Sequence, residues 1–268
     1  MTDTVSIIIS SYNYARFLPE AIASALHQTY PAVEVIVIDD GSTDDSVAVA
    51  CSYSVTVLVQ DNQGVSTARN NAAAAARGKY ILFLDADDTL YPDSIARLMV
   101  RLKDAPANTG YAYGQMEYFD SRTGIFQSRE FDPQALAQGN YICATSLIRK
   151  DAFDAAGGFD RGFAHREDWE FYIRLLHKGY RGAFLAEPVL RYRKHKEPTR
   201  GKSKLPKRLA ATRLEYLYPR FFLREILRHP LRHIYYRWRC HIGPDIRHYG
   251  PSGTLPRPAR TSKDPLPQ

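Results

Sequence analysis

The sequence predicts an α/β fold, built on a mostly parallel sheet and followed by a basic helical extension. Three observations support this prediction. Short apolar runs alternate with helical patterns in the first part of the chain, turn-forming polar strings follow several of these runs, and basic residues gather near the C-terminus. Alternating strands and helices imply parallel strands joined by right-handed crossovers. Ligands of such sheets bind beyond the carboxyl ends of the strands, which is where the polar strings lie.

Four apolar runs in the first half predict strands that are buried on both faces, because they are short and show no polar alternation. These runs are Val5–Ser10, Val33–Ile38, Val55–Val59 and Tyr80–Leu84. The string DDGSTDDS after the second run is expected to be a loop. The expected helices open at Pro19, cover residues 66–77 up to a stop at Gly78, and start at Pro92 with Ile95, Leu98, Met99 and Leu102 on one face.

The pattern changes at Gly110, where the strand–helix alternation ends. Residues 110–120 and 124–131 predict two antiparallel strands. Further along, the sequence predicts a short helix at Asp132–Gln138, a strand at Thr145–Arg149, a turn at Gly157–Asp160, a helix at Arg166–His177 with Trp169, Ile173 and Leu176 facing inward, and short strands at Arg181–Leu185 and Val189–Tyr192. We expect this half to form a wall opposite the strand ends of the first half.

The composition is that of an ordinary globular protein, with 268 residues of which 44% are hydrophobic. Its cysteines, Cys51, Cys143 and Cys240, are too widely spaced to suggest a metal pair or a disulfide framework, so we expect a reducing compartment. The N-terminus has no basic region before its apolar run, and no apolar stretch approaches the ~18 residues that span a bilayer. We therefore expect a cytoplasmic protein without a signal peptide.

Charge divides the chain into two parts. Residues 1–198 hold 20 lysines and arginines against 25 aspartates and glutamates, a net charge of −5, whereas residues 199–268 hold 16 against 4, a net charge of +12. Residues 209–239 interleave aromatic and basic side chains, which suits an amphipathic segment on an anionic membrane, a segment that binds nucleic acid, or a helical extension packed on the body. We expect no nucleic acid, and we expect the Pro-rich residues 250–268 to be disordered.

The string ILFLDADDTL carries three acids within four positions, Asp85, Asp87 and Asp88, at the end of an expected strand. Side chains alternate along a strand, so Asp85 and Asp87 point to the same side. Their oxygens suit a hard cation such as Mg²⁺ or Mn²⁺, although a solvated turn is the plain alternative. As D-x-D-x-T the string resembles the nucleophile loop of haloacid-dehalogenase-type phosphatases, and as D-x-D it resembles the metal site of glycosyltransferases.

Seven strings, in order, resemble those of inverting family 2 glycosyltransferases. They are SIIISSYN with HQTYP, VIVIDDGSTDDS, NQGVSTARN, FLDADDTLYPD, GGFD, EDWEFYIRLLHKGY and YRKH. The resemblance covers roughly residues 4–198. It favours glycosyl transfer over the phosphatase, which would need a downstream lysine, a second acidic loop and its acids at the first strand. That strand ends instead in Ser10, Ser11 and Tyr12.

The resemblance implies a GT-A fold, a Rossmann-like and mostly parallel sheet with helices on both faces. Residues 1–105 would form the half that binds the nucleotide sugar, residues 106–198 the acceptor-binding and catalytic half of the same domain, and residues 199–268 a basic, aromatic extension. The implied enzyme moves a sugar, with inversion, from a UDP-, dTDP- or GDP-linked donor to a sugar or lipid-linked acceptor. Surface polysaccharide or glycolipid assembly, at the inner face of a membrane, is the implied setting. A catalytically inactive protein that binds sugar nucleotides is the alternative of a different class.

Three residues are implied metal ligands, for Mn²⁺ or Mg²⁺: Asp85, Asp87 and His195. Asp168 is the implied general base, since an acceptor hydroxyl must lose its proton as it attacks. Glu167 is expected to position the loop or the acceptor. Both acids also suit the first turn of any helix, and His195 also suits a solvated basic loop.

The donor side is implied to include Asp39 and Asp40, of which Asp40 is favoured as the acceptor of hydrogen bonds from the base or ribose. An Asx turn is the structural alternative for this pair. Ser10 and Tyr12 are expected to frame the base. Arg69 is expected to pair with the site's acids, Asp85 among them, or with the phosphate, and a plain salt bridge suits it equally.

Overall fold

The computed structural model describes residues 2–163, 165–196, 205–228, 230 and 234. The chain divides into two compact units, residues 1–210 and residues 211–268. The disorder expected for residues 250–268 and part of the basic, aromatic segment lie outside the described residues. Within the described residues, no helix combines the length and the apolar character needed to cross a membrane.

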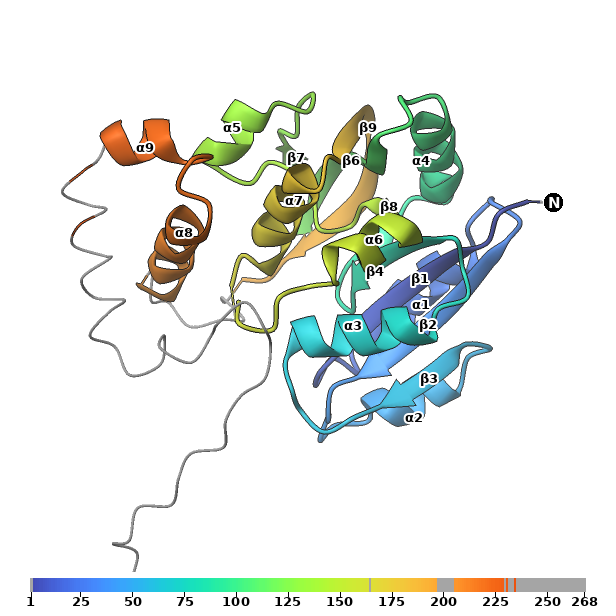
Figure 1. Ribbon diagram of the computed structural model, residues 1–268. Coiled ribbons are helices and arrows are strands. Elements are labelled where there is room, and N and C mark those ends of the chain that lie inside the picture. The colour runs from blue at the N-terminus through green and yellow to red at the C-terminus, as the bar shows by residue number, and fades with distance from the viewer. Residues whose placement is uncertain (1, 164, 197–204, 229, 231–233, 235–268) are drawn as a thin grey trace, which may run out of the picture. The chain divides into compact units, whose positions relative to one another are not determined.

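The strands of the first unit join in one sheet (Figure 1). They are β1 (Val5–Ser11), β2 (Val33–Asp39), β3 (Thr56–Val59), β4 (Tyr80–Asp85), β5 (Thr89–Leu90), β6 (Thr109–Asp120), β7 (Gly124–Phe126), β8 (Leu147–Arg149) and β9 (Arg181–Lys194). Their order is β3-β2-β1-β4-β8-β6-β9-β5, with β7 paired to β6.

Strand direction decides which loops can meet. β1 to β4 are mutually parallel, and β8 runs antiparallel to both β4 and β6. β6 therefore points the same way as β4, and β9 is parallel to β6. The carboxyl ends of β1, β2, β4, β6 and β9 consequently lie at one edge of the sheet.

The helices of this unit cover both faces of the sheet, which confirms the expected layers (Figure 1). They are α1 (Leu18–Leu26), α2 (Ser46–Cys51), α3 (Val65–Ala75), α4 (Ser94–Lys103), α5 (Pro133–Gln138), α6 (Lys150–Ala156) and α7 (Glu167–His177). Helix α8 (Leu205–Leu217) crosses the division between the units, and α9 (Leu223–Arg228) belongs to the second unit.

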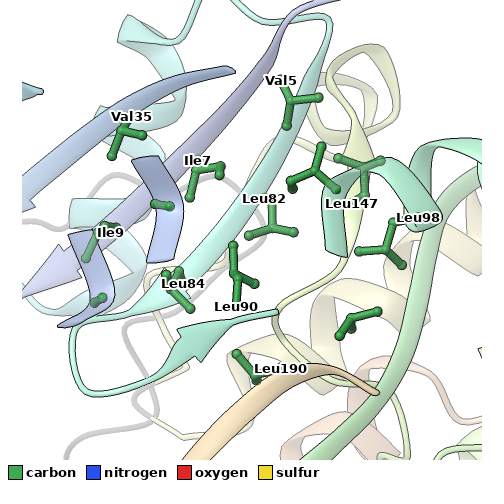
Figure 2. Close-up of a cluster of buried hydrophobic side chains, with 14 of the residues drawn as sticks. Val5, Ile7, Ile9, Val35, Leu82, Leu84, Leu90, Leu98, Leu147 and Leu190 are labelled. Atoms are coloured by element: carbon green, nitrogen blue, oxygen red, sulfur yellow. The ribbon is translucent and has the colours of Figure 1, made fainter. Parts of the chain in front are cut away.

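Alternate residues of the central strands pack on opposite faces. Ile7, Leu82 and Leu84 belong to a buried apolar cluster that includes residues of α1, α2 and α4 (Figure 2). Phe83 points the other way, with its ring centroid 5.1 Å from that of Phe159. Both sets are fully buried, so the strands read as unbroken apolar runs in the sequence.

Two helices were not expected, and two strands have bounds other than those expected. The string DDGSTDDS forms the expected loop after β2 and then leads into the unexpected helix α2, just before which Asp44 Oδ1 accepts from the Ser46 N–H at 3.0 Å. Helix α6 was not expected, and it ends at Gly157, whose φ of 81° suits the left-handed position after a helix. Residues 181–194 form one strand, because the long β6 pairs along its whole length. Strand β7 ends at Phe126 rather than at residue 131.

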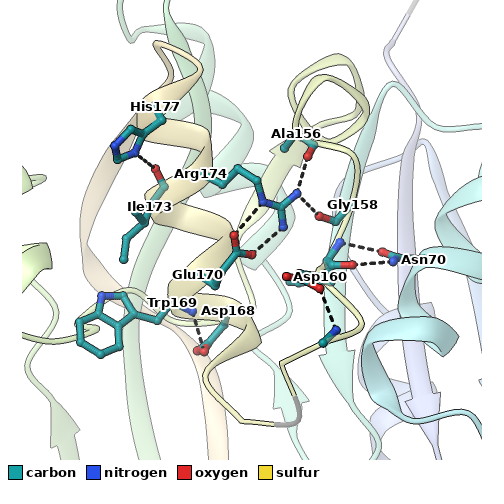
Figure 3. A network of polar contacts seen from close by, with 12 residues as sticks. Asn70, Ala156, Gly158, Asp160, Asp168, Trp169, Glu170, Ile173, Arg174 and His177 are labelled. Atoms are coloured by element: carbon teal, nitrogen blue, oxygen red, sulfur yellow. Dashed lines mark hydrogen bonds and ion pairs between the residues drawn. The ribbon is translucent and has the colours of Figure 1, made fainter. Parts of the chain in front are cut away.

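Helix α7 buries Trp169 and Ile173 as expected, but Leu175 rather than Leu176 is the fully buried leucine. Its middle is fixed by Arg174, which pairs with Glu170 at 2.6 Å and donates to the Gly158 carbonyl at 2.7 Å (Figure 3). The turn before α7 is therefore fastened to the helix itself.

The same turn is also fastened to α3. Asn70 donates from Nδ2 to the Phe159 carbonyl and accepts the Phe159 N–H at Oδ1, both at 2.8 Å (Figure 3). This two-way bond uses both ends of one side chain, so the turn has little freedom to move against α3. The start of α7 is thereby held beside the side chains of α3.

Candidate active site

The three acids of the β4 end form a cluster at the shared edge of the sheet. One carboxylate oxygen from each of Asp85, Asp87 and Asp88 lies within 4.8 Å of the others. Asp88 is 2% exposed, while Asp85 and Asp87 are partly open to solvent. All three offer hard oxygen ligands, so the donor set fits Mg²⁺ or Mn²⁺.

The electrostatics of the cluster favour a bound cation. Burial raises the pKa of Asp87, and the negative charge of Asp85 adds to the rise, while a hydrogen bond with His195 opposes it. Burial also raises the pKa of Asp88 well above its ordinary value, with Asp85 and Asp87 adding to the effect. Acids that disfavour one another's charge in this way are stabilised by a positive ion between them.

His195 reaches the cluster from β9. Its Nε2 lies 2.8 Å from Asp87 Oδ2, although the two residues are 108 positions apart. The ring of Phe17 packs against the imidazole with centroids 5.1 Å apart. The structure therefore brings together the three residues expected as metal ligands, and the parallel course of β9 is what allows it.

Arg193 fastens β9 to the acidic turn. Its backbone N–H donates to Asp88 Oδ1 at 2.9 Å, and its Nε donates to the Asp87 carbonyl at 3.0 Å. The guanidinium also lies over the rings of Phe17 and Phe119, at 4.9 and 4.3 Å from their centroids. Sequence reasoning missed this residue, because one arginine within a basic string carries no sign of its partners.

Arg69 joins the acidic cluster to α7. Nη2 lies 2.6 Å from Asp85 Oδ1, and Nη1 lies 3.4 Å from Glu167 Oε1. The arginine side chain is 4% exposed, yet Nε has no partner among the described residues. Burial lowers the pKa of Arg69, but Asp85 and Glu167 outweigh it and the net change is a rise. Of the two partners expected for Arg69, the acids are the ones it contacts.

Asp168 lies in the first turn of α7 (Figure 3), and Glu167 precedes it in the chain. Its Oδ1 accepts the N–H of Trp169 at 2.8 Å, and its Oδ2 accepts from Asn140 Nδ2 at 2.8 Å. Burial, followed by the negative charge of Glu167, raises the pKa of Asp168 to about 6. A carboxylate with a pKa near neutrality is suited to taking a proton during a reaction. Asn140 is a second residue that the sequence analysis missed.

Asp39 and Asp40 are both buried and both engaged with the backbone. Asp39 Oδ1 accepts from the Ser42 N–H at 2.8 Å, three residues further on, whereas an Asx turn would use the N–H two residues on. Asp40 Oδ2 accepts from the Gly64 N–H at 2.8 Å, and its Oδ1 accepts from Gln60 Nε2 at 2.7 Å. The loop after β2 thus meets the loop before α3, which is the convergence expected of strand-end loops.

Ser10 and Tyr12 lie at the end of β1. This strand stands between β2 and β4, so the two residues lie between the loop that follows β2 and the acidic turn that follows β4. Ser10 is aligned with Ile38 of β2 and with Asp85 of β4 in the sheet register. Tyr12 follows the strand and is 46% exposed. The structure therefore places both residues at the same edge as the acids, and their contact with a base stays a prediction.

The sequence matches the glycosyl transferase family 2 profile over residues 6–157. One curated relative is the Escherichia coli "UDP-Glc:alpha-D-GlcNAc-diphosphoundecaprenol beta-1,3-glucosyltransferase WfaP", 31% identical over 185 residues that cover 66% of this chain and 72% of WfaP. Other glycosyltransferase relatives are matched over only part of their length. The region aligned with this chain covers 31% of one relative and 62% of another.

Solved structures share the fold. S. aureus TarS 1-349 in complex with UDP-GlcNAc superposes with a TM-score of 0.66 at 21% identity, over 80% of this chain and 65% of that one. The mannosyltransferase PcManGT from Pyrobaculum calidifontis, in complex with GDP-Man and Mn²⁺, has a TM-score of 0.61 at 18% identity, over 82% of this chain and 65% of that one.

The mostly parallel sheet and its likeness to TarS show a GT-A fold, and the family profile shows the class, a glycosyltransferase. The chain belongs to glycosyl transferase family 2. This assignment decides between the two resemblances of the D-x-D string, in favour of glycosyl transfer.

The Arg69 bridge predicts a marked loss of stability in Arg69→Met, which removes the charge and leaves Glu167, 9% exposed, without its counterion. Breaking a buried ion pair by removing one partner costs about 3–5 kcal/mol. Urea unfolding measures this loss, and Arg69→Met combined with Glu167→Gln should recover part of it.

The matched control for this experiment is Arg77→Met. Arg77 also pairs with a glutamate, Glu34, at 3.0 Å, but its side chain is 82% exposed, so its removal should cost less than ~1 kcal/mol. Equal losses in the two single variants would contradict a special role for the buried bridge.

Proposed function

We propose that this family 2 enzyme is a metal-dependent, inverting glycosyltransferase. It transfers a sugar from a nucleotide-sugar donor to an acceptor hydroxyl by a single in-line displacement. The observation that carries the proposal is the placement of two acidic sites around one arginine: Asp85 of the acidic cluster and Glu167, the neighbour of Asp168, both contact Arg69. A leaving-group site and a proton acceptor are the two parts that such a displacement needs.

On the donor side, Asp85, Asp87 and His195 are proposed to hold Mg²⁺ or Mn²⁺, with Asp88 as a buried acid behind them. A divalent cation bound there would neutralise the charge that develops on the leaving nucleoside diphosphate. Arg193 keeps the acidic turn in place through its contacts with Asp87 and Asp88. PcManGT, a protein of the same fold, was solved with GDP-Man and Mn²⁺, which supports the choice of metal.

On the acceptor side, Asp168 is the proposed general base. Inversion requires the hydroxyl to attack opposite the leaving diphosphate, so the base must stand apart from the acidic cluster. In the structure Arg69 lies between the two, because it contacts Asp85 on one side and Glu167 on the other. Its positive charge separates negative charges that would otherwise repel. Glu167 is proposed to hold this arrangement rather than to take the proton.

The nucleotide is proposed to bind at the ends of β1 and β2. Asp40, with Asp39 beside it, would accept hydrogen bonds from the base or ribose, and Ser10 and Tyr12 would frame the base. Solved proteins of this fold hold UDP, UDP-GlcNAc and GDP-Man, which supports a UDP-, dTDP- or GDP-linked donor. We assign residues 1–105 to the donor half and residues 106–198 to the acceptor half.

The acceptor is proposed to be a sugar or a lipid-linked sugar, in surface polysaccharide or glycolipid assembly. The relative WfaP is named as a glucosyltransferase that acts on alpha-D-GlcNAc-diphosphoundecaprenol, a lipid-linked sugar. In the second unit of our chain, α9 exposes Leu223 and Leu227 at 53% and 68%, one helical turn apart. Arg224 and Arg228 alternate with these leucines in the sequence, a combination that suits an anionic membrane surface. We propose a cytoplasmic enzyme that associates peripherally with the inner face of the membrane.

A donor screen tests the function as a whole. Thermal unfolding is followed with UDP, GDP and dTDP, each with Mn²⁺, because a ligand that binds the native state stabilises it in proportion to occupancy. Release of nucleoside diphosphate is then measured from UDP-glucose, UDP-GlcNAc, dTDP-glucose and GDP-mannose. Stabilisation without release by any donor, with or without acceptor sugars, would support the inactive binding protein instead.

The proposed metal site predicts that nucleoside diphosphate binding depends on Asp87. In Asp87→Asn, affinity measured by calorimetry with Mn²⁺ should fall about tenfold or more, since even residues behind a metal ligand contribute about 10–100-fold. EDTA should cause a similar loss in the unmodified protein. Asp93→Asn serves as the control, because Asp93 is a nearby acid whose ion-pair partner in the described part of the chain is Arg97. Unchanged affinity in Asp87→Asn and in EDTA would refute the metal assignment.

The proposed base predicts that Asp168→Asn binds donor normally but loses turnover by about 10²–10⁴-fold, because an amide cannot take the acceptor's proton. Glu167→Gln should lose less. In the unmodified enzyme, turnover should fall as the pH drops through the Asp168 pKa of about 6, since the protonated acid cannot act as a base. If Asp168→Asn keeps more than about a tenth of the turnover, the base is a different residue.

The proposed membrane contact predicts that Leu223→Ser combined with Leu227→Ser reduces flotation of the full chain with anionic liposomes. Salt should weaken the flotation of the unmodified protein, because exposed charges are screened. Val59→Ser with Val100→Ser is the matched control, since both valines are 61% exposed in the first unit. Equal flotation of the two double variants, or equal binding to neutral and anionic liposomes, would contradict the prediction.

A further inference from the structure

Asn140 is the neutral side chain in contact with the Asp168 carboxylate. It lies between α5 and β8, and its Nδ2 donates to Asp168 Oδ2 at 2.8 Å. We propose that Asn140 is a positioning residue, which holds Asp168 in the orientation that accepts the proton of the attacking hydroxyl. The inference rests on the proposed role of Asp168 as the general base. It adds a second residue to that role, from the loop between α5 and β8.

The direction of this hydrogen bond is fixed by a second contact. Asn140 Oδ1 accepts the N–H of Ile142 at 3.1 Å, so the amide oxygen is engaged within its own turn. The amide nitrogen is then the end that faces the carboxylate. Rotation of the amide by half a turn would set its oxygen against Asp168 and would lose both bonds, so one orientation is strongly favoured.

The loop that carries Asn140 is itself fastened to α7 on both sides. Before Asn140, the Leu136 carbonyl accepts from Trp169 Nε1 at 2.8 Å. After it, the Cys143 carbonyl accepts from the Tyr172 hydroxyl at 2.8 Å. Both donors stand on the helix that begins with Asp168, so the loop and the carboxylate keep a constant separation. Preorganisation of this kind is what a catalytic carboxylate needs.

The bond from Asn140 fixes the orientation of the Asp168 carboxylate. Oδ1 accepts from Trp169, and Oδ2 accepts from Asn140, so the carboxylate has little freedom to rotate. A carboxylate offers about four acceptor positions, so these two bonds do not by themselves prevent an incoming hydroxyl from donating to it. Donation from Asn140 to the charged form also favours ionisation of Asp168.

Other groups face Asp168 and set the background for this effect. They are Glu167 and Arg166 beside it in the chain, Arg69 of α3, Tyr172 of α7 and Cys143 of the Asn140 loop. Within the described part of the chain, neither Glu167 nor Arg69 forms a hydrogen bond with the Asn140 side chain. A change at Asn140 therefore acts on Asp168 directly.

The first test is a substrate-free titration. Aspartate side chains are labelled with ¹³C at the carboxyl carbon, and the Asp168 signal is identified by its loss in Asp168→Asn. Asn140→Ala should raise the pKa of Asp168 by about one pH unit, since a bond to the charged form is lost. Asn140→Asp, which is isosteric, should also raise it, because a second carboxylate then faces the first. Asn108→Ala, at an exposed asparagine, should leave the titration unchanged. An unchanged pKa in both Asn140 variants would overturn the inference.

The second test is turnover of the donor that the screen selects from UDP-glucose, UDP-GlcNAc, dTDP-glucose and GDP-mannose, with Mn²⁺. Asn140→Ala should lower kcat about tenfold at a pH near 6 with the donor KM unchanged, and the acid limb should move upward by about one unit. In the Asp168→Asn background the same change should have no further effect, because residues that act as a unit are not additive. Full turnover in Asp168→Asn would overturn both the role of Asp168 as the base and the role of Asn140 as its positioning residue. If Asp168→Asn is inactive but Asn140→Ala has unaltered turnover and an unaltered pH profile, only the role of Asn140 is overturned.

Discussion

The buried guanidinium of Arg69 is the constraint on which the arrangement of the site depends. A charge that is almost fully removed from water is tolerated only when it is paired, and the two partners of Arg69 come from β4 and α7. Asp85 and Glu167 must therefore approach α3 together. Asn70, the next residue of α3, forms two hydrogen bonds with the backbone of Phe159. These bonds hold the turn before α7 against α3. Chain segments that are distant in sequence are thus brought to one helix by adjacent side chains.

The arrangement of the site also depends on the direction of β9. A strand that returned antiparallel to β6 would end at the opposite edge of the sheet, far from the acidic turn. Because β9 is parallel to β6, it delivers Arg193 and His195 to Asp87 and Asp88. The residues proposed for the donor-side metal site consequently meet at one sheet edge, although the acidic turn and β9 are separated by about a third of the chain.

Much of the first half was predictable because its signals are local. Strands buried on both faces appear in the sequence as apolar runs. The acids of the D-x-D string can be recognised from the string alone, without knowledge of the rest of the fold. The pairing of β6 with β9 was not predictable, because it depends on contacts between distant segments. Helices α2 and α6 are too short to show a clear period, and α2 has no side-chain cap at its start, while Gly157 ends α6. Arg193 and Asn140 escaped notice because each acts through partners that the fold supplies, so neither lies in a recognisable pattern.

The loops at the strand ends are fastened by hydrogen bonds within the protein itself. Asp39 holds the turn at Ser42, Asp40 holds the backbone of Gly64, and Asn13 accepts the Thr43 N–H at 2.7 Å. Ordering a loop when a ligand arrives would subtract from the affinity, and here that entropy has been lost during folding. Donor recognition should then be close to rigid-body docking, with affinity differences between nucleotides arising from direct contacts.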